Sequence, residues 1–159
     1  ADVRRRHIGF VFQSYNLFPT LTAHENVLVA LDVRRAQSGD PAEAATRALT
    51  EVGLSHRIHT YPSKLSGGEK QRVAIARSLA GNPSVVLADE PTAALDSENG
   101  KAVMELLAKV AQDPNRAVLA VTHDHRTLGY ADRIIRIEDG RIVADERPSN
   151  KSMQYSAAA

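Results

Sequence analysis

The sequence predicts an α/β fold, with a parallel sheet as its core and a helical segment inserted between two of the strands. Three short apolar runs, residues 8–12, 85–88 and 117–121, have the length and residue types of buried strands. Patterns typical of helices separate the later runs, which is the alternation expected of a parallel sheet. Between about residues 22 and 80 the helical patterns follow one another without a strand, so this stretch is predicted to be all-helical.

The chain begins with polar residues and enters its first strand almost at once. The basic run Arg4–Arg6 is interpreted as a solvated approach to the strand, and Ile8–Phe12 is the strand itself. Residues 13–20 are polar and include Pro19, so they are expected to form a loop.

Two consecutive helices follow the loop. Thr22 and Glu25 have the spacing of a capping box and begin a helix that runs to about residue 36. Asp40 is followed by a proline, the arrangement of an N-cap with proline at the first helical position, and Gly53 ends this second helix. No strand is predicted between the two helices.

The last third of the sequence returns to alternating helix and strand. A helix is predicted from Asp96 to about residue 112, and its apolar residues recur at helical spacing: Val103, Leu106, Leu107 and Val110. Residues 133–137 and 141–143 flank an Asp-Gly pair at 139–140 and predict a hairpin. Residues 147–159 are expected to be a frayed tail.

Composition excludes several classes of protein. The 159 residues are 43% hydrophobic and 25% charged, which excludes a disordered chain. With 20 basic and 19 acidic residues the net charge is +1, so no electrostatic argument favours a nucleic-acid partner. The absence of cysteine excludes disulfide scaffolds and thiolate metal sites. No apolar run approaches the roughly 20 residues of a membrane span.

The sharpest local motif is Leu65-Ser66-Gly67-Gly68-Glu69, at the start of a predicted helix that continues through Leu79. Ser66 and Glu69 form a second capping box. Glycines at the first helical positions cost about 1 kcal/mol each relative to alanine, but they leave the backbone N–H groups bare at the positive end of the helix dipole. Such a terminus is suited to bind phosphate. An ordinary capped helix after a glycine turn would show the same five residues.

Two carboxylates, Asp89 and Glu90, end the apolar run 85–88. Neighbouring residues of a strand point to opposite sides, so the two acids are able to serve different tasks. One of them could hold Mg²⁺ and the other could polarise an attacking water. Acidic residues in an ordinary loop before a proline are the structural alternative.

Single polar residues also end the other two strand candidates. Gln13 follows the first strand and His123 comes just after the strand 117–121, at the end where α/β sheets hold their ligands. Taken alone, His123 fits an ordinary surface or hydrogen-bonded histidine better than a ligand-binding one, and Gln13 indicates no function. His123 and His125 form too small a set to indicate a metal site.

The order and spacing of these pieces resemble the nucleotide-binding domain of ABC transporters over about residues 6–146. Gln13 is similar to the Q-loop glutamine, and residues 65–69 to the ABC signature, with Glu69 in place of the commoner glutamine. Asp89 and Glu90 resemble the Walker B aspartate and the catalytic glutamate. Two further matches complete the set: residues 91–96 with the D-loop, and residues 121–124 with the H-loop histidine, His123.

The resemblance implies a P-loop NTPase-type parallel sheet core, here partial, with an inserted α-helical subdomain. The expected divisions are residues 1–21 for the first strand and Q-loop, 22–80 for the helical subdomain with the signature, 81–146 for the remaining core, and 147–159 for the tail. The ligands implied are ATP and Mg²⁺. The implied partners are a second ATPase subunit in a head-to-tail homodimer and a transmembrane permease, at the cytoplasmic face of the inner membrane.

The resemblance also supplies residue roles. Glu90 would act as general base and His123 would touch the γ-phosphate. Asp89 and Gln13 would hold Mg²⁺, and Gln13 would also couple the site to the permease. The nucleotide-binding set would be completed across the dimer by the signature residues and the D-loop aspartate: Ser66, Gly67, Gly68, Glu69 and Asp96.

The phosphate-binding P-loop, G-x-x-x-x-G-K-[ST], does not occur in these 159 residues. In the family it precedes the Q-loop strand, so we expect it upstream of Ala1. These residues alone are therefore expected to bind ATP poorly and not to hydrolyse it. The stretch 16–27 is most similar to the branch that exports lipoproteins, macrolides and glycolipids.

Two other classes of function stay open from the sequence. An ATPase head of the SMC type, which maintains DNA, shares the signature and Walker B motifs, but it inserts a long coiled coil where this chain has only the short stretch from Gln13 to Leu65. A non-catalytic fragment with a binding or regulatory role would keep the same fold elements. Nucleotide binding and co-purification with a permease would separate these alternatives.

Overall fold

The computed structural model describes residues 2–34 and 39–148. The chain divides into two compact units, with the boundary between His123 and Asp124. The predicted tail, residues 147–159, lies outside the described residues from position 149 onward.

The first unit contains most of the secondary structure. Its elements are, in order, α1 (Asp2–His7), β1 (Ile8–Val11), α2 (Ala23–Arg34), α3 (Pro41–Glu51), α4 (Gly67–Leu79), β2 (Val85–Asp89), α5 (Ser97–Val110) and β3 (Ala117–Val121). Two single-turn 3₁₀ helices, η1 (Ser55–Arg57) and η2 (Pro62–Lys64), connect α3 to α4.

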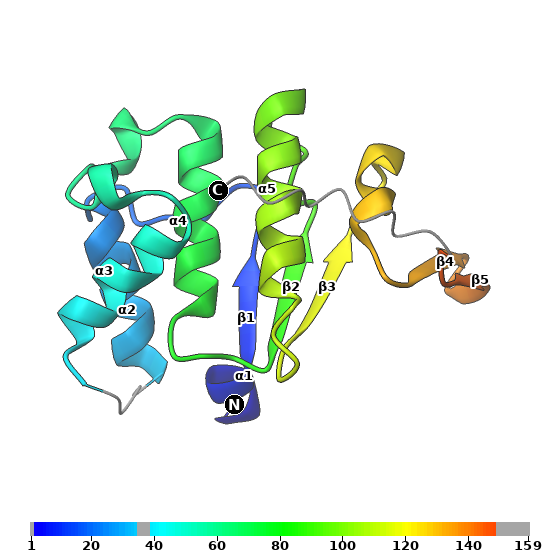
Figure 1. Cartoon of the computed structure of the whole chain (residues 1–159), viewed down its shortest axis with the longest axis horizontal. Coiled ribbons are helices and arrows are strands. Elements are labelled where there is room, and N and C mark those ends of the chain that lie inside the picture. Colours follow the sequence, from blue (N-terminus) through cyan, green and yellow to red (C-terminus); the bar gives the residue numbers. More distant parts are fainter. Residues whose placement is uncertain (1, 35–38, 149–159) are drawn as a thin grey trace, which may run out of the picture. The chain divides into compact units, whose positions relative to one another are not determined.

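The three strands of this unit form a parallel sheet in the order β1-β2-β3 (Figure 1). Phe10 pairs with Leu87, and Leu87 pairs with Leu119. The parallel sheet predicted from the three apolar runs is confirmed. Because all three strands run in the same direction, their carboxyl ends lie at one edge of the sheet.

Helices α4 and α5 pack on the sheet and on each other. The residues of β1 and β2 alternate in burial, so that Val11, Val86 and Ala88 are buried in the core. Leu119 and Val121 of β3 are 56% and 60% exposed. The sheet core is therefore concentrated on β1 and β2, beneath α4.

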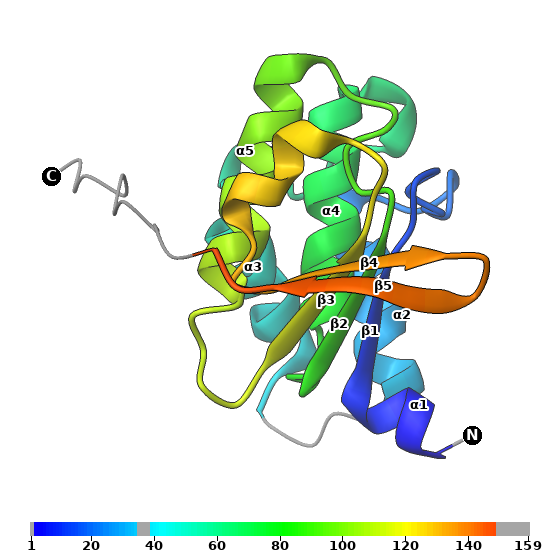
Figure 2. The same cartoon turned by 90° about the vertical axis from the view of Figure 1, so that its right-hand side faces the viewer.

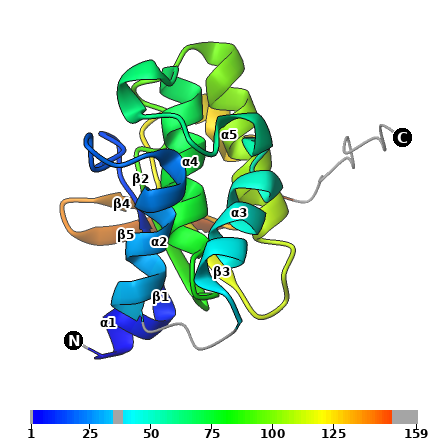
Figure 3. The same cartoon turned by 90° about the vertical axis from the view of Figure 1, so that its left-hand side faces the viewer.

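Residues 22–80 contain no strand in the part that the structure describes, as the sequence predicts. Figure 3 shows α2 and α3 beside α4, and the three helices contact one another pairwise. Their shared core includes Val27, Leu49, Leu54 and Val73, each fully buried. Helix α4 contributes to this core and to the sheet core, so it joins the helical insertion to the sheet.

The predicted helix starts are confirmed by their hydrogen bonds. The amide of Thr22 donates to the Glu25 carboxylate at 2.7 Å, and the amide of Glu25 donates to the Thr22 hydroxyl at 3.2 Å. Asp40 accepts from the amide of Ala42 at 2.9 Å and caps α3. These caps satisfy backbone N–H groups that have no partner inside the helix.

One sequence prediction is wrong. Arg4–Arg6 belong to helix α1 and are not an extended approach to the strand. The acidic residue of the first turn, Asp2, accepts a 2.7 Å hydrogen bond from Arg5, and the Arg4 guanidinium lies 4.9 Å from the centre of the Phe10 ring. Arginine is a good helix former, and a cation above an aromatic face is attracted to it, so both effects favour the helix.

The second unit contains η3 (His125–Tyr130) and an antiparallel hairpin of β4 (Ile134–Glu138) and β5 (Arg141–Glu146), which Figure 2 shows edge to edge. Asp139 and Gly140 both have positive φ, 48° and 74°, as the favoured two-residue hairpin turn requires. The predicted hairpin is confirmed, with a second strand that extends three residues further than expected.

None of the described helices combines the length and the apolar character that a bilayer crossing requires.

Candidate functional site at the carboxyl edge of the sheet

The sequence-predicted site residues of the three strands share one edge of the sheet. Gln13 lies just after β1, Asp89 ends β2 and is followed by Glu90, and His123 follows β3. Because β2 is the central strand, its two acids stand between the ends of the other two strands. This edge is where open α/β sheets bind ligands.

Glu90 and His123 are in direct contact. Nδ1 of His123 lies 2.6 Å from Oε1 of Glu90. The Glu90 side chain is 19% exposed and that of His123 is 83% exposed, so the contact has a sheltered carboxylate and an accessible imidazole. A carboxylate and an imidazole at this distance are able to exchange or share a proton and to orient a water molecule.

The backbone at Glu90 is unusual. Its φ is +47°, a left-handed conformation that residues other than glycine seldom adopt. The Glu90 amide donates to the Val121 carbonyl at 2.9 Å, which holds the turn against the end of β3. Strained residues of this kind cluster at functional sites, where the surrounding structure compensates their cost.

Asp89 is exposed and Glu90 is half-buried, so the two acids meet different surroundings, as the alternation of a strand predicts. Oxygen ligands from a carboxylate and an amide are the kind that Mg²⁺ accepts, and this ion commonly keeps several water ligands. Asp89 and Gln13, at the ends of adjacent strands, fit that donor set. The described residues contain no group of three or more acidic or histidine side chains placed to hold a metal, so a protein-only cage is not built here.

The signature residues begin helix α4 with a complete capping box. The Glu69 amide donates to the Ser66 hydroxyl at 3.2 Å, and the Ser66 amide donates to the Glu69 carboxylate at 2.8 Å. The hydrogen bond from the Ser66 amide, followed by one from Arg57, holds the pKa of the Glu69 carboxyl below its ordinary value. Arg57 Nε donates to the second carboxylate oxygen at 2.9 Å.

The two signature glycines have a packing role that the sequence did not indicate. A Cβ on Gly68 would lie 2.8 Å from Cγ of Asn99 in α5, and a Cβ on Gly67 would lie 3.1 Å from the Tyr15 hydroxyl. Bare backbone for a ligand was the predicted reason for these glycines. Close approach of neighbouring side chains is a second reason, and at Gly68 it is sufficient by itself.

Asp96, the predicted D-loop aspartate, caps helix α5. Its Oδ1 accepts from the amides of Asn99 at 2.9 Å and Glu98 at 3.1 Å, and its Oδ2 accepts from the Asn99 side-chain amide at 2.6 Å. These hydrogen bonds, chiefly that from the Asn99 amide, lower the pKa of Asp96. Asn99 therefore links the D-loop to the signature glycine Gly68.

The loop after Gln13 is attached to α4. Tyr15 and Asn16 have positive φ values of 62° and 49°. Arg77 of α4 donates to the carbonyls of both residues, at 2.8 Å for Tyr15. Gln13 itself is exposed, so its position depends on this two-residue turn.

A third connection starts from the middle of α4. Gln71 is fully buried, and its side-chain amide donates to the Pro91 carbonyl at 2.8 Å, one residue after Glu90. Sequence reasoning assigned no function to Gln71, Arg77 or Arg57. Gln71 and Arg77 are polar residues in a helix that otherwise supplies the core, and this conflict is a signal that the sequence gives for them. Arg57 lies in η1 and gives no such signal.

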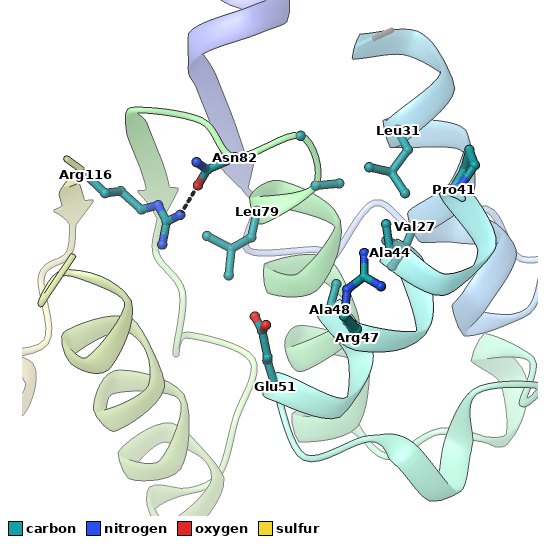
Figure 4. Close-up of a pocket in the computed structure, with 12 residues that line it drawn as sticks. Val27, Leu31, Pro41, Ala44, Arg47, Ala48, Glu51, Leu79, Asn82 and Arg116 are labelled. Carbon is teal, nitrogen blue, oxygen red and sulfur yellow. Dashed lines mark hydrogen bonds between the residues drawn. The ribbon is translucent and has the colours of Figure 1, made fainter. Parts of the chain in front are cut away.

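A pocket of about 410 Å³ lies elsewhere, between α2, α3 and the end of α4 (Figure 4). Leu31 and Leu79 line its apolar part, while Arg47, Glu51 and Arg116 line its polar part. Arg116 immediately precedes β3, so this pocket borders the amino edge of the sheet. None of the predicted site residues lines it.

Comparison with known proteins identifies the family. The family described as ABC transporter matches residues 1–93. The chain is 44% identical over 142 residues to a putative hemin import ATP-binding protein, HrtA, of Staphylococcus haemolyticus, and this match covers 89% of the chain and 64% of HrtA. It is 46% identical over 158 residues to the macrolide export ATP-binding/permease protein MacB of Nitrobacter winogradskyi, a match that covers 99% of the chain and 24% of MacB.

A solved structure agrees with the sequence relatives. The dimeric post-hydrolysis state of the ATP-binding cassette MJ0796 of Methanocaldococcus jannaschii, bound to ADP and Pi, superposes with a TM-score of 0.80 at 41% identity. The match covers 92% of this chain and 65% of that one. The chain thus spans less than two thirds of the length of these relatives. With a family match over more than half of its residues, the chain belongs to the ABC transporter family.

Proposed function

We propose that this chain is part of the ATP-binding subunit of an ABC transporter and contributes the residues that couple ATP hydrolysis to transport. The observation that carries the proposal is the contact between Glu90 and His123 at the carboxyl edge of a parallel sheet, with 2.6 Å between Oε1 of Glu90 and Nδ1 of His123. The solved relative, which is bound to ADP and Pi, supports a nucleotide as the ligand.

Each residue at the edge has a separate task in this proposal. Glu90 accepts the proton of the attacking water, because its carboxylate is sheltered yet accessible. His123 keeps that carboxylate oriented and presents its exposed ring to the γ-phosphate. Asp89 and Gln13 would hold Mg²⁺, which when bound neutralises the phosphate charge.

The signature turn would act across a dimer. Ser66, Gly67 and Gly68 present a helix N-terminus, and such a terminus favours an anion. We propose that it meets the nucleotide of a second, head-to-tail copy, with Asp96 at the interface. The dimeric state of the solved relative supports the presence of a second copy.

We also propose a permease partner, at the cytoplasmic face of the inner membrane, and export as the direction. Support comes from the name of MacB, which joins ATP-binding and permease parts in one export protein. Residues 1–21, 22–80 and 81–146 would then be the first strand with its Q-loop, the helical subdomain and the rest of the core. An ATPase head of the SMC type is not favoured, because the longest described helix between Gln13 and Leu65 has 12 residues.

The proposal is tested by phosphate release from the complete gene product that contains this chain. Glu90→Gln should lower kcat by about 10²–10⁴-fold, the usual contribution of a general base, and leave ATP binding intact. Glu43→Gln, at an exposed position of α3, is the matched control and should hydrolyse ATP like the parent. The 159 residues alone should neither bind ATP well nor hydrolyse it. Turnover that survives Glu90→Gln would exclude Glu90 as the base.

A further inference from the structure

The carboxylate of Glu69 is shared between two partners. Oε2 accepts the Ser66 amide at 2.8 Å and completes the capping box. Oε1 accepts Arg57 Nε, from η1, at 2.9 Å. The Glu69 side chain is only 12% exposed, whereas that of Arg57 is 42% exposed. The two oxygens of the Glu69 carboxylate therefore have different partners. The hydrogen bond from Arg57 restricts the rotation of this carboxylate, whose other oxygen accepts the Ser66 amide.

A carboxylate at this position conflicts with the task proposed for the signature turn. The turn should attract a phosphate, and a negative side chain in its first helical turn repels one. The commoner glutamine offers the same capping geometry without the charge. A chain with glutamate here needs a compensating cation, and Arg57 lies at hydrogen-bonding distance from it. His56 Nε2, 3.9 Å from the same oxygen, is the other basic group facing Glu69.

We propose that Arg57 is a positioning residue for the signature turn. It neutralises Glu69 and holds it against Ser66, so that the Arg57–Glu69 pair replaces a single neutral glutamine and leaves the turn able to accept an anion. This inference rests on the proposed function. It concerns how Ser66 is presented, and it assigns Arg57 no contact with the nucleotide.

The first test is a double-mutant cycle on ATP hydrolysis by the complete gene product. Arg57→Met should raise the KM for ATP about tenfold, with a smaller effect on kcat, because an unneutralised charge opposes binding. Glu69→Gln removes the charge that Arg57 neutralises, so the double variant should have the KM of Glu69→Gln and not that of Arg57→Met. Arg47→Met and Glu43→Gln on α3 form the matched control pair, since their 3.5 Å ion pair is well exposed. A double variant as impaired as Arg57→Met would overturn the proposal.

Salt separates electrostatic positioning from a general loss of structure. Salt screens the repulsion between a carboxylate and a phosphate, although less strongly for Glu69, whose side chain is 12% exposed, than for a fully exposed group. The ratio of the KM of Arg57→Met to that of the parent should therefore fall as ionic strength rises from about 0.05 to 0.5 M. A purely structural defect would not respond in this way. A ratio that is independent of salt would also overturn the proposal.

Two further measurements cover the remaining outcomes. If Arg57→Met does not fold, Arg57→Lys retains the charge and should keep the KM within about threefold of the parent, despite losing the planar Nε donor. A lysine variant without ATP affinity overturns the proposal. If the parent itself lacks ATPase activity, the proposed function fails. The Arg57–Glu69 pair is then tested by thermal unfolding of the parent, the two single variants and the double variant. Additive changes in Tm would then disprove the coupling between Arg57 and Glu69.

Discussion

Two buried helical glycines of this chain should respond in opposite ways to the same substitution. Gly68 lies at the start of α4 and Gly100 lies in the first turn of α5. A Cβ on Gly100 would lie 3.6 Å and 3.8 Å from two Thr92 atoms, an ordinary contact. Gly100→Ala should therefore stabilise the fold by about 0.5–1 kcal/mol, the usual gain of alanine over glycine in a helix.

At Gly68 the new Cβ would lie 2.8 Å from Cγ of Asn99. Asn99 cannot rotate away freely, because its side-chain amide donates to Asp96 at 2.6 Å. Overpacking costs about 1–3 kcal/mol, and loss of that hydrogen bond adds about 1 kcal/mol. After the helical gain of alanine is subtracted, Gly68→Ala should destabilise the fold by about 1–3 kcal/mol.

The assay is thermal unfolding of the two variants, followed by circular dichroism. For a chain of this size about 1 kcal/mol changes Tm by about 2–4 °C, so Gly68→Ala should melt at least about 3 °C below Gly100→Ala. Asn99→Ala removes the two shortest contacts of the new Cβ and leaves Cβ of residue 99 at 3.1 Å, so Gly68→Ala combined with Asn99→Ala should regain part of the loss. Equal Tm values for the two single variants would refute the packing argument, and a double variant no better than Gly68→Ala would exclude Asn99 as the cause.

Two further predictions concern single side chains. Asn26 is fully buried; its amide donates to the carbonyls of residues 18, 21 and 22, and its oxygen accepts the Phe18 amide at 2.8 Å. Asn26→Asp replaces that donor by an acceptor and should cost about 2–3 kcal/mol in urea unfolding near neutral pH, whereas an unchanged midpoint would contradict the network. For Glu69, whose folded pKa is lowered from 4.5, the stabilisation is complete above about pH 4.5 and is lost as pH falls through the lower folded value. The free energy of unfolding, measured with urea, should therefore fall less below that pH in Glu69→Gln than in the parent. The same fall in the variant and the parent would contradict the pairing of Glu69.

Local signals predicted the helices well, because a cap needs only residues close in sequence. Ser66 with Glu69, Asp40 and Asp96 all cap helices as their spacing or residue type suggests. The strands were predicted equally well from apolar runs. The error at Arg4–Arg6 arose because a run of arginines fits an exposed helix as well as an exposed extended segment, and the contact of Arg4 with Phe10 favours the helix.

The positions of the candidate site residues at the strand ends could be predicted from the sequence, but the contacts among these residues could not, and their roles stay predictions. Nothing in the sequence says that Glu90 and His123 touch, because their contact depends on β2 and β3 being neighbours in the sheet. Arg77 reaches the Tyr15 carbonyl across 62 positions of the chain, and no local pattern encodes such a bond. The resemblance to the family predicts the order of the motifs along the chain. The side chains that contact these motifs come from distant parts of the chain and are known only from the fold.

Helix α4 has a consequence for how the site loses its structure. The helix has 13 residues and is about 20 Å long. Its first turn lies against Asn99, the residue that donates to Asp96. Further along the helix, Gln71 donates to the Pro91 carbonyl and Arg77 donates to the Tyr15 carbonyl. Opening of this helix releases all three contacts together. Amide hydrogens of α4 should therefore exchange with solvent at the rate of a single cooperative event, and the first turn of α5 and the loops at Tyr15 and Pro91 should lose protection together with it.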